Sequence, residues 1–374
     1  MAERARRSGP VRFDVVMELA LYAPGAGFYQ TGGHAGREGG QFLTSPEVGP
    51  LFGAVLARAL DTWWRELDRP DPYVAVEAGA GRGTLAASVL AARPACAPAL
   101  RYLLVERSDA LRRAQAGRLA LEPAGEVLGA LTGGGGDEPP VVLGGLGPLA
   151  ASLGELPAGP FPGVVLANEL LDNLPFRLLR RAGDGWHEVF VDEHLDEVMV
   201  PAEEEAAARA DALAPGAPLG ASVPLQDQAR EWLRSALACP QRGRIVVADY
   251  ADRTASLADR PVATWLRTYR THGPGGPVLS ELGRQDITCE VAVDQLATVQ
   301  APSSDRSQAE FLAAHGIGVL ADEARRSWTD RAAVGDLDAL KARSRVSEAA
   351  ALTDPAGLGA FRVVEWTVPD PSNR

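Results

Sequence analysis

The sequence has a single lysine, Lys341, few cysteines and no long apolar run. Its 37 Lys and Arg residues are therefore nearly all arginine, and against 49 acidic residues they leave a formal charge of −12. This acidity argues against a nucleic-acid binder, whose surface would carry a basic field. No apolar stretch approaches the ~20 residues that span a bilayer. We therefore expect no nucleic-acid partner and no membrane span.

The three cysteines, Cys96, Cys239 and Cys289, lie far apart and share no ligand-like spacing with the five histidines. Neither a disulfide framework nor a zinc site is expected from such a pattern, so we predict no metal. Scarce cysteine also fits a reducing compartment. The arginines of the first ten residues surround no apolar core, so this end does not read as a secretory signal.

The most informative segment is a predicted buried strand that ends in an acidic residue and continues with glycine at every second position. Its key residues are Glu77, Gly79, Gly81 and Gly83. A dinucleotide fingerprint would place its third glycine at position 84, where Thr84 stands. The spacing instead resembles motif I of class I S-adenosylmethionine methyltransferases. The alternative is a glycine-rich strand-to-helix turn that holds no ligand.

Each of these positions, and Glu106 further along the chain, has a physical reason to bind a cofactor. The glycines allow the backbone to approach a ligand with no Cβ in the way. Glu77 offers a carboxylate to the cationic amino-acid end of S-adenosylmethionine. Glu106 follows Gly83 by 23 residues and ends the next predicted strand. An acid at about this distance chelates ribose hydroxyls in related nucleotide sites. We assign Glu77, Glu106 and the three glycines to the cofactor.

Apolar runs alternate with helical stretches from Tyr73 onward, which predicts an α/β fold with a mostly parallel, doubly wound sheet. The strands are predicted at 73–78, 102–106, 141–144, 163–167 and 244–249. Helices are expected at 13–22, 45–64, 84–92, 109–120 and 308–341, a hairpin at 177–200 and a surface loop at 123–140. Ser45 is expected to cap its helix, with Pro46 at the first helical position.

Polar residues follow directly on the fourth predicted strand. Asn168, Glu169 and Asp172 lie where the carboxyl ends of neighbouring strands face one crevice, so we expect them to meet the methyl acceptor. The alternative is a helix start with its cap and first-turn acids. Asp249 ends the fifth strand and is a weaker candidate. The segment from Leu266 to His272 has the composition of a mobile cationic loop.

Taken in order, these segments resemble the MidA family of class I S-adenosylmethionine methyltransferases along nearly the whole chain. Thr44-Ser45-Pro46-Glu47 and the Asn168-Glu169…Asp172 segment are the most particular to that family. The resemblance implies a Rossmann-like methyltransferase fold over 67–374, with insertions at about 177–241 and 251–306. Residues 1–66 would form an N-terminal helical lid, in which Thr44, Ser45 and Pro46 close over the cofactor.

The same resemblance implies methyl transfer from S-adenosylmethionine to a protein arginine, with Glu169, Asp172 and Asn168 as the catalytic residues. Carboxylates suit this task because they orient a guanidinium in fork geometry. A small-molecule acceptor, or a cofactor-binding assembly factor of a respiratory complex whose catalysis is dispensable, are the alternatives. About a dozen residues precede the family-like part, which is short for a mitochondrial presequence, so we expect a bacterial cytoplasm. The oligomeric state stays open.

Overall fold

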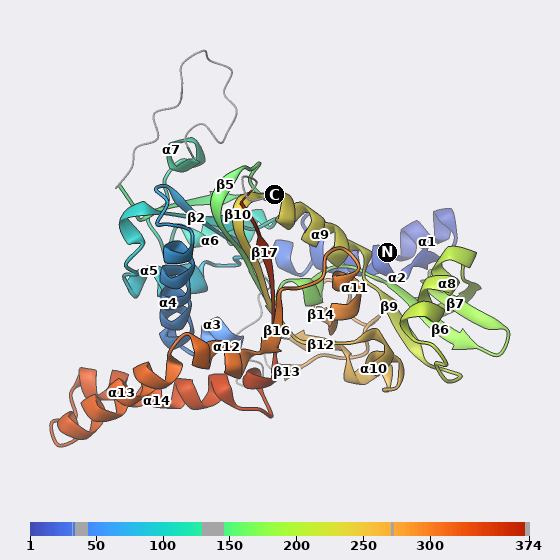
Figure 1. Cartoon of the computed structure of the whole chain (residues 1–374). Coiled ribbons are helices and arrows are strands. Elements are labelled where there is room, and N and C mark those ends of the chain that lie inside the picture. Colours follow the sequence, from blue (N-terminus) through green and yellow to red (C-terminus); the bar gives the residue numbers. More distant parts are fainter. Residues whose placement is uncertain (32, 34–43, 129–145, 271–272, 371–374) are drawn as a thin grey trace, which may run out of the picture. The chain divides into compact units, whose positions relative to one another are not determined.

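A computed structural model of the protein describes residues 1–31, 33, 44–128, 146–270 and 273–370 (Figure 1). The chain divides into two compact units, each assembled from three separate stretches. The first unit comprises Met1–Phe42, Glu169–Ser235 and Asp249–Ala301. The second comprises Leu43–Asn168, Ala236–Ala248 and Pro302–Arg374. The predicted insertions at about 177–241 and 251–306 thus lie largely in the first unit, with the first 42 residues.

The second unit is organised around a seven-stranded sheet. In spatial order its strands are β16 (Ser304–Ser307), β17 (Arg362–Val368), β10 (Pro240–Asp249), β5 (Phe161–Asn168), β2 (Tyr73–Ala78), β3 (Leu100–Val105) and β4 (Leu149–Leu153). The pairs from β10 to β4 are parallel, and β16 pairs antiparallel with β17. β2 has β3 on one side and β5 on the other, so the strand order reverses there. Open α/β sheets bind ligands at such a switch point.

The helices of the second unit lie before, between and after its strands along the chain. They are α3 (Ser45–Val48), α4 (Pro50–Glu66), α5 (Thr84–Ala91), α6 (Asp109–Gln115), α7 (Ala124–Leu128), α12 (Gln308–Ala314), α13 (Ile317–Arg331) and α14 (Leu337–Thr353). α4 packs along α5, and α13 and α14 form a helical hairpin (Figure 1). None of the helices in the described residues combines the length and apolar character needed to span a bilayer.

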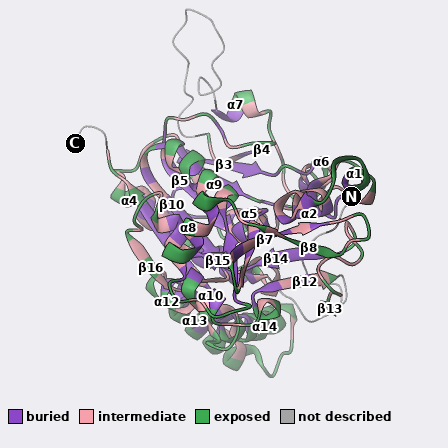
Figure 2. Ribbon diagram, turned by 90° about the vertical axis from the view of Figure 1, so that its right-hand side faces the viewer, coloured by how far each residue is buried: buried purple, intermediate pink, exposed green. Residues whose placement is uncertain are grey.

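Strands β2 and β3 lie in the core of the second unit. Every residue of both strands is buried, as expected for parallel strands covered on both faces. Figure 2 colours β3, β5 and β10 largely as buried. Leu60 and Trp63 of α4 join this core, and the guanidinium of Arg244 lies 5.0 Å from the Trp63 ring centroid.

The first unit contains smaller sheets. β1 (Val11–Arg12), β7 (Gly185–Val191), β6 (Arg177–Ala182) and β9 (Ser222–Leu225) lie in that order, with β8 (Glu197–Pro201) also on β7. β13 (Gly273–Pro274), β12 (Leu266–Arg270) and β14 (Asp286–Cys289) form a second sheet, and β11 (Ala251–Asp252) pairs with β15 (Val291–Ala292). The helices are α1 (Ala2–Ser8), α2 (Phe13–Tyr22), α8 (Glu204–Leu213), α10 (Thr254–Ala258) and α11 (Val293–Ala297), while α9 (Asp227–Ala238) crosses into the second unit.

The core of the first unit depends on one face of α2. Phe13, Met17 and Leu21 recur at helical spacing and are buried, and the Phe13 ring lies 5.4 Å from that of Phe176. This matches the predicted helix at 13–22. The hairpin predicted at 177–200 is also confirmed, as β6 and β7 pair antiparallel around its glycine turn.

Several predicted elements differ from the structure. The helix expected at 45–64 is two helices, because Gly49 and Pro50 interrupt it. Residues 266–270 are strand β12, held between two partner strands, and not a mobile loop. Part of the predicted loop at 123–140 is helix α7, and the helix expected at 109–120 ends at Gln115. The strand predicted at 141–144 and the residue His272 lie outside the described residues.

Candidate functional site

The glycine-rich turn of the second unit connects β2 to α5. Gly79, Gly81 and Gly83 all have positive φ, at 70°, 52° and 78°, which favours glycine over other residues. A Cβ added to Gly81 would meet nothing within 4 Å, so open space lies beside this backbone. A Cβ added to Gly83 would come within 3.1 Å of the Leu104 side chain. Gly81 is thus the glycine with room for a ligand, while Gly83 lies close to the Leu104 side chain.

Glu106 follows β3 and is joined to this turn by a hydrogen bond. Its Oε2 accepts from the backbone N–H of Gly81 at 3.0 Å, and its Oε1 accepts from that of Ser108 at 2.8 Å. Burial raises the pKa of Glu106, and the two backbone hydrogen bonds oppose this shift. Each carboxylate oxygen can accept a further donor. Glu106 is therefore oriented at the turn with capacity left for two hydroxyl groups.

Glu77 has a more enclosed position than Glu106. Its Oε2 accepts a hydrogen bond from the Tyr102 hydroxyl at 2.8 Å, across the β2–β3 pair. Burial raises the pKa of Glu77 to about 8, against the opposing effects of Tyr102 and the backbone of Ala86. Tyr102, which the sequence did not single out, is the partner that fixes this carboxyl group. The cofactor role of Glu77 stays a prediction.

Gln115 of α6 is a residue to which the sequence assigned no role. It is fully buried, its Nε2 donates to the carbonyl of Gly81 at 2.9 Å, and its Oε1 accepts from the Ser152 hydroxyl at 2.5 Å. Gln115 thus links the middle glycine of the turn to β4. Its partners are 34 and 37 residues away, so no local sequence pattern points to this role.

The segment predicted as a lid begins α3. Thr44 holds the N-cap position, so the expected cap at Ser45 is wrong by one residue. Ser45 is the first helical residue, and its buried hydroxyl donates to Oε1 of Gln308 at 2.9 Å. Pro46 follows within the first turn, and α3 packs against α5, the helix that starts after Gly83. Closure of this segment over the cofactor stays a prediction.

Asn168 is the last residue of β5, the strand beside β2. In the register, Ala167 faces Ala78 on β2, and Asn168 faces Ala248 on β10. The carboxyl ends of β2, β3 and β5 are therefore level with one another. The sequence prediction that Asn168 lies at the same sheet edge as the glycine turn is confirmed by this register.

Glu169, the next residue along the chain, begins the acidic part of the first unit. Its φ of +50° turns the backbone sharply out of the strand. A short turn at Leu171–Asn173 follows, and the carboxylate of Asp249 caps it. Oδ2 of Asp249 accepts from the N–H of Leu171 at 3.0 Å and of Asp172 at 3.3 Å. Asp249, a weak candidate from sequence, thus positions Asp172 directly.

The carboxyl groups of this part are buried close to one another. Burial, and then the charge of Asp249, raises the pKa of Asp172 well above its usual range. Burial, and then Glu169, raises the pKa of Asp249 to about 8. The pKa of Asp286 rises to about 6 through burial. Each value reflects the cost of ionising a carboxyl group beside other acids and away from water.

A network of side chains anchors the other side of the Leu171–Asn173 turn. The Tyr29 hydroxyl lies 3.0 Å from Oδ1 of both Asn173 and Asp286. Nδ2 of Asn173 donates to Oδ1 of Asp286 at 3.0 Å, and the Tyr22 hydroxyl donates to the Asn173 carbonyl at 3.2 Å. Tyr22 and Tyr29 thus hold Asn173, the residue next to Asp172, in place.

A small pocket of the first unit is bordered by Asp172, Tyr250, Trp265, Arg267 and Tyr269. Two of its buried polar atoms, Oδ1 of Asp172 and Nε1 of Trp265, have no hydrogen-bond partner within the part of the chain that the structure describes. The same described part contains no cluster of three or more side chains suited to hold a metal ion.

The fold and the glycine turn define a class I S-adenosylmethionine methyltransferase, and comparison with known proteins gives the family. The profile of an S-adenosyl-L-methionine-dependent methyltransferase family matches residues 55–309. A Burkholderia thailandensis protein crystallised with S-adenosyl-homocysteine superposes with a TM-score of 0.77 at 28% identity, over 98% of this chain and 90% of that one. The chain belongs to this MidA-like methyltransferase family.

Three curated proteins are also similar to this chain, which covers a smaller share of each than of the Burkholderia protein. Protein arginine methyltransferase NDUFAF7 of Mus musculus is 27% identical over 92% of this chain and 80% of its own length. The Drosophila melanogaster homologue is 32% identical over 50% of this chain, which spans only 42% of that protein. For the Rattus norvegicus protein the chain spans 66% of the length, at 29% identity.

The cofactor is S-adenosylmethionine, and the residues of the glycine turn fit it. The open space beside Gly81 lies next to a carboxylate, Glu106, that retains hydrogen-bonding capacity. That combination suits a ligand carrying vicinal hydroxyls. Glu106 and the turn would hold the nucleoside, and the bound cofactor supplies an electrophilic methyl group.

Proposed function

We propose that the chain transfers a methyl group from S-adenosylmethionine to a guanidinium nitrogen of a protein arginine. The buried acidic cluster of the first unit, Asp172, Asp249 and Asp286, carries this proposal. Carboxyl groups with raised pKa values are costly to ionise, and a bound cation would offset that cost. The names of the mouse and rat relatives, both protein arginine methyltransferases, support the same acceptor class.

The chemistry of a guanidinium explains why carboxylates are needed. A guanidinium has a pKa above about 12 and is a poor nucleophile until its charge is held to one side. Asp172 and Glu169 would take hydrogen bonds from its N–H groups and leave one nitrogen free to react. The free nitrogen would then take the methyl group that the bound cofactor supplies, in exchange for the carbon–sulfur bond, and the acceptor would give up one proton. Asp249 can receive that proton only as a carboxylate, a form that burial disfavours and that the charge of a bound guanidinium would favour.

The decisive experiment uses the full chain with isotope-labelled S-adenosylmethionine and a lysate of the source strain lacking the gene. We expect label in methylarginine of one or few proteins, detected by mass spectrometry, and the same mark absent from the deletion strain. Asp172→Asn should lower the rate at least 100-fold while cofactor binding persists. Label in a small molecule, or in another amino acid, would overturn the arginine assignment.

The alternative is an assembly factor whose catalysis is dispensable. Complementation of the deletion strain distinguishes this role from the catalytic one. If Glu169→Ala or Asp172→Ala binds the cofactor normally and fully complements the deletion, catalysis does not carry the biological role. If complementation fails while cofactor affinity is normal, the methyl transfer itself is required.

A further inference from the structure

Both backbone polar groups of Gly81 are held by side chains of the second unit. Its N–H donates to Oε2 of Glu106 at 3.0 Å, and its carbonyl accepts from Nε2 of Gln115 at 2.9 Å. Because a backbone amide has a single N–H, that donor is used within the protein. What Gly81 offers to a ligand is the open space beside its Cα, and the two side chains determine where this space lies.

The amide group of Gln115 has only one orientation that suits its surroundings. A backbone carbonyl accepts but cannot donate, so the NH2 group must face Gly81. Oε1 then faces Ser152, whose hydroxyl donates to it at 2.5 Å. Gln115 is fully buried, so a rotated amide would lose both bonds with no water to replace them. Ser152 therefore orients the group that holds Gly81.

Gln115 also packs against a second glycine of the turn. A Cβ added to Gly83 would lie 3.6 Å from Cγ of Gln115. The stem of the side chain thus lies beside Gly83 while its tip bonds to Gly81. One residue of α6 therefore fixes two points of the glycine turn.

The end of β4 supports Gln115 and Glu106 together. Ser152 bonds to Gln115, and the carbonyl of Leu153 accepts from the N–H of Glu106 at 3.0 Å. Both β4 residues are held in register by β3. Two adjacent residues of one strand thus fix the two side chains that hold Gly81.

We propose that Gln115, oriented by Ser152, is a positioning residue for S-adenosylmethionine. It acts on the cofactor only through Gly81, by holding the open space beside this glycine in place before the ligand arrives. A turn that is already ordered does not pay an ordering cost on binding, so Gln115 should raise cofactor affinity. The proposal does not depend on the identity of the methyl acceptor.

Isothermal titration of the full chain with S-adenosylmethionine tests this role. Gln115→Met keeps the length of the side chain but has no amide, and it should weaken binding about tenfold through the lost hydrogen bonds. Gln285→Met is the matched control. Gln285 is also fully buried and donates to the carbonyls of Pro277 and Ser280 at 2.9 and 2.8 Å, but it belongs to the first unit. We expect both variants to lower the melting temperature, and only Gln115→Met to weaken cofactor binding at a temperature where both are folded.

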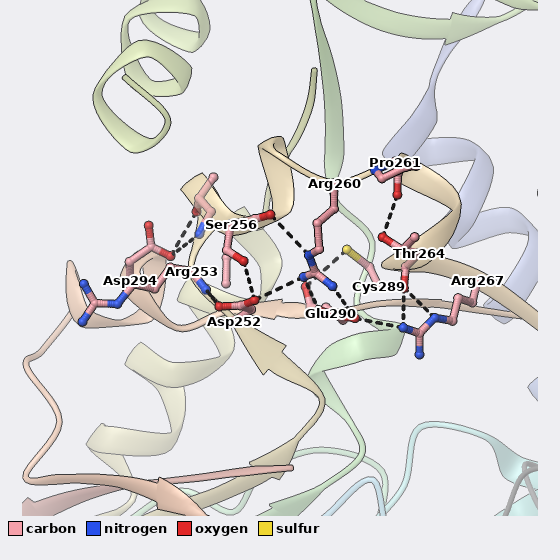
Figure 3. Close-up of polar contacts among 12 residues, drawn as sticks. Asp252, Arg253, Ser256, Arg260, Pro261, Thr264, Arg267, Cys289, Glu290 and Asp294 are labelled. Carbon is pink, nitrogen blue, oxygen red and sulfur yellow. Dashed lines mark hydrogen bonds and ion pairs between the residues drawn. The ribbon is translucent and has the colours of Figure 1, made fainter. Parts of the chain in front are cut away.

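Substitutions of Ser152 test how the amide is oriented. Ser152→Ala removes the hydroxyl and should weaken binding about threefold, whereas Ser152→Thr keeps the donor and should bind like the wild type. Ser256→Ala is the control for loss of a serine hydroxyl, because Ser256 donates to Oδ2 of Asp252 at 2.6 Å in the first unit (Figure 3). It should leave cofactor affinity unchanged.

The outcomes separate positioning from a purely structural role. Wild-type affinity in folded Gln115→Met, or a loss no larger than that of Gln285→Met, overturns the proposal. Equal losses in Ser152→Ala and Ser152→Thr also overturn it, and these two variants decide alone if Gln115→Met does not fold. If Glu106→Gln weakens binding and the Gln115 and Ser152 variants do not, the turn remains the cofactor site and only the present proposal fails.

Discussion

Oε2 of Glu106 accepts a hydrogen bond from the backbone N–H of Gly81 at 3.0 Å. The bond joins the end of β3 to the glycine turn that follows β2, two segments 25 residues apart in sequence. It orients the carboxylate before any ligand arrives, which lowers the entropy that binding must overcome. The pair is therefore preorganised for the cofactor-binding role that the sequence predicts for it.

Glu106→Gln should weaken cofactor binding and leave the fold intact. An amide presents one acceptor oxygen instead of two, and hydrogen bonds to a charged group are worth about 1.5–3 kcal/mol, or roughly 10- to 150-fold in affinity. Isothermal titration with S-adenosylmethionine measures this, and thermal melting checks the fold. Glu126→Gln on α7 is the exposed control. An unchanged dissociation constant for Glu106→Gln would remove Glu106 from the cofactor site.

Gly81→Ala isolates the effect of space from that of backbone strain. Gly81 and Gly216 both have positive φ, 52° and 76°, and an added Cβ meets nothing within 4 Å at either position. Alanine should therefore cost each site a similar amount of stability, about 1–2 kcal/mol. Only Gly81→Ala should also lower cofactor affinity, by at least tenfold. Equal affinity in the two variants would show that the open space beside Gly81 is not used.

The elements that sequence predicted best are those set by local pattern. α2 and β2 match their predicted bounds, since apolar spacing alone defines a helix face and a fully buried strand. β4 was missed because Leu149–Leu153 is rich in alanine, leucine and serine, and its strand state comes from pairing with β3. β12 was missed for a similar reason, because its charged residues are held in a sheet by β13 and β14.

The site residues also fall into those that local sequence pattern places and those that it does not. Glu106 could be placed from spacing because the strand–turn–helix unit fixes where the next strand ends. Asp249 could not be assigned its role, because the N–H groups it caps lie 77 and 78 residues away. No local sequence pattern distinguishes Tyr102 or Gln115, and only the tertiary structure brings them to Glu77 and Gly81. Polar contacts between residues far apart in the sequence could not be predicted from local pattern.

Glu77 should make stability depend on pH. Its pKa is about 8 in the folded protein against a usual value near 4.5, so between these values the folded chain holds a proton that the unfolded chain has lost. Stability contributed by this group is therefore lost as pH rises from about 5 to 8, by at most about 1.4 kcal/mol per pH unit. Glu77→Gln, which mimics the neutral acid, should flatten the curve from urea denaturation at several pH values. Parallel curves for the two proteins would contradict the raised pKa.

Tyr29→Phe should loosen the turn that presents Asp172. The Tyr29 hydroxyl is shared between Oδ1 of Asn173 and Oδ1 of Asp286, and its loss leaves buried acceptors short of a donor. We expect a loss of about 1–3 kcal/mol in the free energy of unfolding. Tyr22→Phe, which removes a single longer bond of 3.2 Å to the Asn173 carbonyl, should cost less. Because the network holds the residue next to Asp172, Tyr29→Phe should also lower the methyl-transfer rate more than it lowers cofactor affinity. A variant that loses stability but keeps its full rate per folded molecule would show that the network serves the fold alone.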